Sequence, residues 1–130
     1  MDDETTGRLA GLLVGATCTG VGVPNGQLHA VFGSRGLHVG SAWRVVHEGE
    51  IVAGSDTAPD LAEKKLMEAL VGHTVRTVST HGAFNDLHLH FDCGPVLETF
   101  ANAEGYEHWQ LAGGPDEMIV AGTGPLWSSF

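Results

Sequence analysis

Four short blocks of this sequence occur twice in the same order, and no other feature limits the possible folds as strongly. The separation between matching blocks grows from 57 to 68 positions, so the second occurrence has gained residues between blocks, as loops commonly do. The pattern predicts two copies of one supersecondary unit. The matched pairs are 13–17 (LVGAT) with 70–74 (LVGHT), 28–32 (LHAVF) with 87–91 (LHLHF), Trp43 with Trp109, and 51–54 with 119–122 (both IVAG).

The repeat divides the chain without making two domains. We expect repeat 1 at residues 5–56, a linking helix at 58–71, repeat 2 at 66–124 and a tail at 125–130. A unit of about 60 residues buries too little surface alone, but two such units can share one core. Residues 1–130 are therefore expected to form a single domain.

Apolar residues alternate with polar ones inside each copy, as in half-buried strands. Leu87, Leu89 and Phe91 alternate with histidines, and glycine-rich turns separate such runs. Pro59 marks the start of the linking helix. We predict a mainly β fold (all-β or α+β) in which two tandem repeats, each a helix plus a β-meander, form one sandwich or partly open barrel of about ten strands.

The charge of the sequence argues against a nucleic-acid partner. The sequence has 16 Asp and Glu against 6 Lys and Arg, a net charge of −10, and neither Lys nor Arg follows Arg76. Because contacts to phosphate depend on Lys and Arg, nucleic-acid binding is not expected. The acidic excess either keeps the protein soluble or marks a surface for a basic protein partner, and the composition leaves both open.

The N-terminal part favours a cytoplasmic protein. Asp2, Asp3 and Glu4 stand where a secretory signal would be basic, and the uncharged stretch 9–23 is too short and too polar to span a bilayer. In that compartment Cys18 and Cys93 are expected to be free thiols.

Catalytic motifs are missing from the sequence. It has no Gly-x-Ser-x-Gly elbow, and its glycine pairs do not fit a phosphate loop. Cys93 follows Asp92, whose carboxylate would raise the pKa of the thiol, and a turn residue is the simpler interpretation. We expect no enzymatic activity and no cofactor.

Eight histidines raise the question of a metal site. His88 and His90 lie two apart in a predicted strand, so their side chains share one face and could provide half of a zinc site. His108 is the third candidate ligand, with His29, His81 and Asp86 as further candidates. Histidines on the solvent face of a strand are the alternative.

The tryptophans differ in their expected roles. Trp43 and Trp109 occupy matching positions, where they are either core anchors or a symmetric aromatic site, and their apolar neighbours favour the core. Trp127 and Phe130 fall in the tail, where they either cap the core or join an interface.

Several hydrophobic motifs carry a resemblance to known proteins. They are Leu-Val-Gly-x-Thr-Val at 70–75, Leu-x-Leu-x-Phe-x-x-Gly at 87–94, the tryptophan at 109 and Ile-Val-Ala-Gly at 119–122. With them the second copy resembles a group of small uncharacterised bacterial β-rich proteins. The resemblance implies a small β-rich fold without assigned catalytic residues. Some acidic members of this kind resemble immunity proteins encoded beside polymorphic toxins.

These observations lead us to expect a non-enzymatic binding protein, an immunity protein that covers the basic active-site cleft of a toxin with an acidic face. Tyr106 would be its aromatic anchor. The alternatives are a small-ligand or metal-binding domain using His88, His90 and His108, and a self-associating module that forms a homodimer. The residues expected to contact the partner are Glu98, Glu104, Tyr106, Glu107, Asp116, Glu117 and Trp127.

Overall fold

The computed structural model describes residues 3–101, 108–113, 118–121 and 127–129, which contain two α-helices and eleven strands. The helices are α1 (Asp3–Leu13) and α2 (Pro59–Leu70). The strands are β1 (Gly20–Gly22), β2 (Leu28–Phe32), β3 (Arg35–Val39), β4 (Ala42–His47), β5 (Glu50–Gly54), β6 (Val75–His81), β7 (Asp86–Phe91), β8 (Val96–Phe100), β9 (Trp109–Gly113), β10 (Met118–Ala121) and β11 (Trp127–Ser129).

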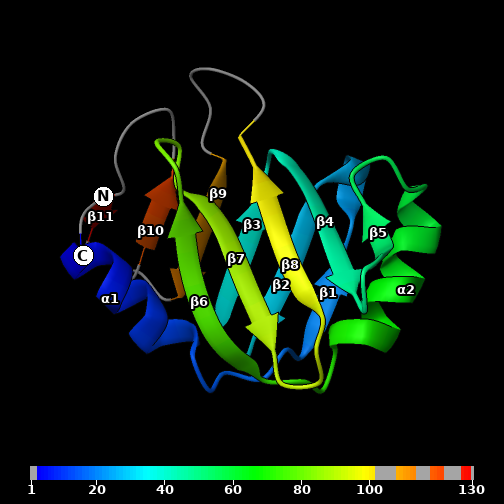
Figure 1. Cartoon of the computed structure of the whole chain (residues 1–130), viewed down its shortest axis with the longest axis horizontal. Helices are drawn as coiled ribbons and strands as arrows, with labels where there is room; N and C mark the ends of the chain where they lie inside the picture. The colour runs from blue at the N-terminus through cyan, green and yellow to red at the C-terminus, as the bar shows by residue number, and fades with distance from the viewer. Residues whose placement is uncertain (1–2, 102–107, 114–117, 122–126, 130) are drawn as a thin grey trace.

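The strands form two antiparallel sheets that lie one behind the other (Figure 1). A six-stranded sheet has the order β1-β2-β3-β9-β10-β11, and a five-stranded sheet has the order β5-β4-β8-β7-β6. Over the described residues both sheets keep free edges and do not close into a barrel. The predicted β-rich sandwich is confirmed at this level, and the two helices make it an α+β fold.

The predicted meander is wrong in one respect, because consecutive strands do not stay in one sheet. After β3 the chain crosses to the five-stranded sheet for β4 and β5, and after β8 it crosses to the six-stranded sheet for β9 and β10. Gly40 and Ser41 make the first crossing, and their backbone N–H groups both donate to the carbonyl oxygen of His108. Alternation along a strand predicts which face is buried but not which strand lies next to it, so this exchange was not foreseen.

The tail also contributes a strand that was not foreseen. β11 pairs with β10, so the described part of the chain has eleven strands instead of the expected ten or so.

Both matched tryptophans lie in the core, as predicted. Trp43 is 2% exposed and Trp109 is fully buried. Phe32 and Phe91 stack with their ring centroids 6.4 Å apart and join the two sheets through the core. The other large, fully buried side chains are Leu9, Leu13, Leu28, Leu37, Leu66, Leu70, Leu87, Leu89, Leu97 and Leu111.

The helices lie at opposite ends of the sandwich (Figure 1). α2 packs against the edge strands β5 and β1, and α1 packs against the edge strand β6. Each helix buries one apolar stripe, and Pro59 is at the first position of α2, as predicted. A helix across sheet edges protects them from pairing with another chain. Neither described helix is long and apolar enough to cross a membrane.

Candidate functional site

An open pocket of about 710 Å³ lies where α2, the β4–β5 turn and the β7–β8 turn meet. Its lining carries three carboxylates and one ammonium group, a net charge of −2 when its two histidines are neutral. Apolar side chains make up another part of the lining. The lining residues are Glu48, Glu50, Glu68, Lys65, His47, His73, Ile51, Val52, Ala69, Cys93 and Pro95.

A tight turn places two of the carboxylates. His47 pairs with Glu50 across the β4–β5 hairpin, which leaves Glu48 and Gly49 as a two-residue loop. Both loop residues have positive φ, 53° for Glu48 and 78° for Gly49, as in a type I′ turn. Glutamate is an unusual residue in this left-handed conformation. The Glu48 side chain is 86% exposed, with Oε1 3.3 Å from Nε2 of His47.

The helix α2 supplies another part of the lining. Ala62, Leu66 and Leu70 are buried, so they hold α2 against the body of the protein. Lys65 and Glu68 lie three residues apart on the part of the helix surface that borders the pocket. Opposite charges at this spacing partly compensate one another, while Glu48 and Glu50 belong to the part of the lining that the hairpin supplies.

Three potential metal ligands meet at one side of this pocket. One ligand atom each from His73, Asp92 and Cys93 lies within 4.8 Å of the others. Nδ1 of His73 is 3.4 Å from Oδ1 of Asp92. All three side chains are reachable by solvent: His73 is 36% exposed, Asp92 is 51% exposed and Cys93 is exposed. Imidazole, carboxylate and thiolate are all ligands of zinc.

Backbone hydrogen bonds hold these residues together. Asp92 N–H donates to the carbonyl oxygen of Thr74 at 2.9 Å, which ties the β7–β8 turn to the residue after His73. Gly94 N–H donates to Phe91, and φ of Gly94 is 114°, a value that suits only glycine. An added Cβ at Gly94 would also meet the His47 ring at 3.1 Å, so the turn lies tightly against β4.

Both cysteines are free, as predicted: Cys18 is buried and Cys93 is exposed. Partial desolvation, followed by the neighbouring Asp92 carboxylate, raises the pKa of the Cys93 thiol. Burial raises the pKa of Cys18. Both thiols are therefore protonated at neutral pH unless another group displaces the proton, and neither is an activated nucleophile.

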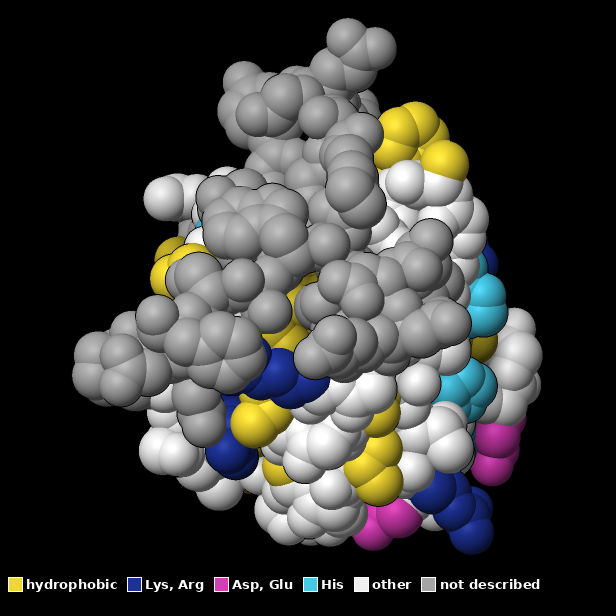
Figure 2. Space-filling view, turned by 90° about the vertical axis from the view of Figure 1, so that its left-hand side faces the viewer, with side chains coloured by type: hydrophobic (Ala, Val, Ile, Leu, Met, Phe, Trp, Pro, Cys, Tyr) yellow, Lys and Arg dark blue, Asp and Glu magenta, His cyan; other side chains and the backbone are white. Residues whose placement is uncertain are grey.

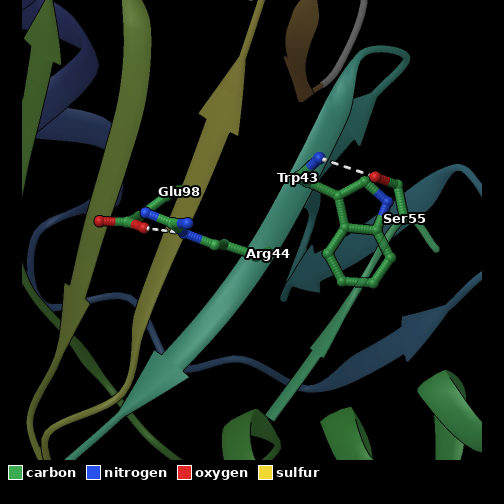
Figure 3. Close-up of polar contacts among 4 residues, drawn as sticks. All are labelled: Trp43, Arg44, Ser55 and Glu98. Atoms are coloured by element: carbon green, nitrogen blue, oxygen red, sulfur yellow. Dashed lines mark hydrogen bonds and ion pairs between the residues drawn. The ribbon is translucent and has the colours of Figure 1, made fainter. Parts of the chain in front are cut away.

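Of the residues expected to contact a partner, Glu98 is engaged within the protein. Its Oε1 accepts a 2.6 Å hydrogen bond from Nε of Arg44 across β4 and β8 (Figure 3). Its side chain is only 19% exposed. Trp127 is in β11, but its side chain lies outside the described part. Glu104, Tyr106, Glu107, Asp116 and Glu117 lie outside the described residues.

The three predicted histidine ligands are not all brought together. His88 and His90 are on the outer face of β7, as the alternation predicts. The His88 ring lies 4.2 Å from that of His81, and desolvation, followed by the charge of His81, lowers the pKa of His88. His108 is buried and meets Phe84 edge-on. Within the described residues, only the set of His73, Asp92 and Cys93 gathers three potential ligands.

Figure 2 looks onto the α1 end, where some of the described Lys and Arg side chains lie beside hydrophobic ones, and the described Asp and Glu side chains in view lie near the bottom and the lower right. The carboxylates of the pocket belong instead to the end formed by α2.

The pocket could not be predicted from the sequence, because its lining comes from three distant segments. Cys93 was interpreted as a turn residue, and His73 was not singled out. The sequence offered one indication of this site, the matched block 70–74. The end of this block lies antiparallel to the turn at 92–95, and this contact brings His73 toward Asp92. No family model, curated protein or solved structure matches the chain. The resemblance to small bacterial β-rich proteins therefore stays a prediction.

Proposed function

We propose that this chain is a non-enzymatic binding protein of the immunity type, which inhibits a basic partner protein by occupying its active-site cleft. The observation that carries the proposal is the acidic pocket, whose lining combines Glu48, Glu50 and Glu68 with apolar side chains. The proposal adds the α2 end of the protein to the contact surface expected from the sequence, of which Glu98 is already engaged by Arg44.

The pocket suits an arginine or lysine side chain of the partner. The apolar stem of such a side chain can lie along Ile51, which is 63% exposed, while its charged head meets the carboxylates. Charge-assisted hydrogen bonds of this kind are about twice as strong as neutral ones. A toxin that acts on nucleic acid has a cleft rich in such residues.

The charge of the whole chain supports the same partner. A net charge of −10 attracts a basic protein over distances longer than any direct contact and raises the association rate. This effect falls as salt rises, because at physiological ionic strength charges are screened beyond about 8 Å. Dissociation depends on short-range contacts and is affected less.

The test begins with capture of the partner from the native cell, followed by binding kinetics with the purified partner. We expect Glu48→Gln combined with Glu68→Gln to lower the association rate about tenfold. The matched control, Asp60→Asn with Glu63→Gln, removes the same charge from an exposed part of α2 that does not line the pocket. Equal effects of the two pairs, or capture of no basic protein, would contradict the proposal.

We infer in addition that the chain is an internal duplication. The order of one helix and five strands occurs twice, in α1 to β5 and in α2 to β10. Thr17 pairs with Thr74, its match in the sequence repeat, and their hydroxyl oxygens are 3.1 Å apart. Matching residues around this pair make matching hydrogen bonds. Gly15 N–H to Val75 O corresponds to Gly72 N–H to Cys18 O, both 2.8 Å, and Cys18 N–H to His73 O corresponds to Val75 N–H to Ala16 O, both 2.9 Å.

The matched tryptophans support the same inference. The indole of Trp43 donates to the carbonyl oxygen of Gly26, and the indole of Trp109 donates to that of Asn85. Gly26 and Asn85 correspond under the 59-residue offset that relates 28–32 to 87–91. Superposition of an experimental structure tests this: residues 9–56 should overlay 66–124, with Trp43 on Trp109. Unrelated environments for the two indoles would contradict it.

A further inference from the structure

We propose that His73, Asp92 and Cys93 form a binding site for one divalent transition metal ion, with zinc as the best match. The proposal does not depend on the inhibitory function, because it rests on the donor set and its geometry. It also differs from the predicted histidine site, since it uses neither His88 nor His90.

One of the three separations between ligand atoms already matches a tetrahedral zinc site. At the usual zinc bond lengths, neighbouring ligand atoms are roughly 3.3–3.7 Å apart. Nδ1 of His73 and Oδ1 of Asp92 already have a separation of 3.4 Å. All three ligand atoms lie within 4.8 Å of one another, so side-chain adjustments of about an ångström complete the arrangement.

The backbone around these ligands is fixed before any metal binds. His73 N–H donates to Leu70 at 3.0 Å, the His73 carbonyl accepts from Cys18 N–H at 2.9 Å, and Asp92 N–H donates to Thr74. Ligands held in this way lose little conformational freedom on binding, which favours affinity. A surface ion pair would need only His73 and Asp92; the thiol at the same point adds the ligand that selects zinc over magnesium or calcium.

Metal binding releases one proton. The Cys93 thiol loses its proton to solvent when sulfur bonds to the metal, and His73 binds through the neutral Nδ1. Three protein ligands leave a fourth position for water. His73 and Cys93 both line the pocket, so this position is open to solvent on that side.

The test uses untagged, reduced full-length protein and cobalt(II) as a spectroscopic probe that zinc displaces. We expect one cobalt ion per chain, with a thiolate-to-cobalt charge-transfer band in the near ultraviolet that zinc abolishes. Cys93→Ser should remove the band. His73→Gln should weaken metal binding by at least about tenfold, because loss of a residue that merely hydrogen-bonds to a metal ligand already lowers metal affinity by about that factor. The double variant His88→Gln with His90→Gln is the matched control and should bind as wild type does.

A second measurement does not depend on the spectrum. Cys18 is fully buried, so labelling of the native protein with a thiol reagent reports Cys93. At a zinc concentration of about ten times Kd, labelling should slow about tenfold, because only the metal-free fraction reacts. Absence of a thiolate band at one equivalent, labelling unaffected by zinc, or loss of binding in the His88 and His90 control would each overturn the proposal. Glu48→Gln with Glu68→Gln should leave metal binding intact, which separates this test from that of the inhibitory function.

Discussion

The indole nitrogen of Trp109 donates a 2.9 Å hydrogen bond to the backbone carbonyl of Asn85, and both residues are buried. Asn85 lies immediately before β7, with φ of 55°, so the bond links the start of β9 in one sheet to the β6–β7 turn of the other. One side chain thus fills core volume and satisfies a carbonyl group that water cannot reach.

Replacing Trp109 should therefore lower stability in two ways, through the lost hydrogen bond and through the lost core volume, and two variants separate them. Trp109→Phe keeps an aromatic ring but removes the buried indole hydrogen bond, which should cost about 1–3 kcal/mol. Trp109→Ala also creates a cavity and should cost about 3–5 kcal/mol. Chemical denaturation followed by circular dichroism measures both. Trp43→Phe is the matched comparison, because its indole makes the equivalent bond to Gly26. Unchanged stability of Trp109→Ala would show that this tryptophan does not hold the core.

The ion pair between Arg44 and Glu98 should contribute little to stability. Arg44 is 44% exposed and also lies over the Phe100 ring, with its guanidinium carbon 4.8 Å from the ring centroid. Pairs exposed to this degree typically contribute up to about 1 kcal/mol. A double-mutant cycle with Arg44→Met and Glu98→Gln should give a coupling energy in that range that falls with added salt.

The same cycle tests the contact surface first expected from the sequence. Glu98→Gln alone should leave binding of a captured basic partner unchanged, because Arg44 already compensates the carboxylate. A large loss of binding in Glu98→Gln would return the contact surface to the outer face of β8.

Local patterns predicted the elements of the fold well. Leu87, Leu89 and Phe91 alternate with exposed or half-buried residues, and Pro59 begins the helix where expected. These predictions depend on residues that are neighbours in the chain, where strand and helix periods determine which face is buried. In the structure β4 and β5 cross to the five-stranded sheet, and β9 and β10 cross to the six-stranded sheet. This crossing depends on long-range strand pairing, about which the alternation of apolar and polar residues carries no information.

The candidate site was less predictable for the same reason. Glu98 was singled out for its charge, but its pairing with Arg44 depends on the register of β4 and β8. His73 and Asp92 are far apart in the sequence and are brought together by the pairing of β6 with β7 and the hydrogen bond from Asp92 to Thr74. Sequence alone identified chemically suitable residue types, while tertiary contacts decide which of them converge.

Stability should fall as the pH drops below neutrality, and His88 should account for part of this fall. Desolvation, then the charge of His81, lowers the pKa of His88, with a smaller contribution of the same sign from His90, while Glu98 and Asp86 oppose the shift. The unfolded chain, with an ordinary histidine pKa of about 6.5, therefore binds a proton more readily than the folded protein. The loss of stability therefore begins near the unfolded-state pKa of His88, about 6.5, and is complete once the pH is below its lowered folded-state pKa.

His88→Gln should accordingly reduce the dependence of stability on pH. Denaturation of wild type and variant at about pH 8 and about pH 5 measures it, with each protein at pH 8 as its own reference. A ring titration of His88 by NMR gives the folded-state pKa directly. Equal loss of stability in both proteins, or a His88 pKa above the ordinary value, would contradict the prediction.

Glutamate at position 48 should favour binding of a basic partner and, at the same time, lower the free energy of unfolding. Its φ of 53°, followed by 78° at Gly49, fits a type I′ turn, in which Asn-Gly and Asp-Gly are the preferred pairs. Glu48→Asn and Glu48→Asp should both raise the free energy of unfolding, by about 0.5–1 kcal/mol. Only the asparagine variant removes the charge, so it should slow association with a basic partner while the aspartate variant retains most of the rate. Denaturation and binding kinetics on the same three proteins check both effects. If the two variants weaken binding equally, the position of the carboxylate matters more than its charge, and if either lowers stability, the turn does not disfavour glutamate.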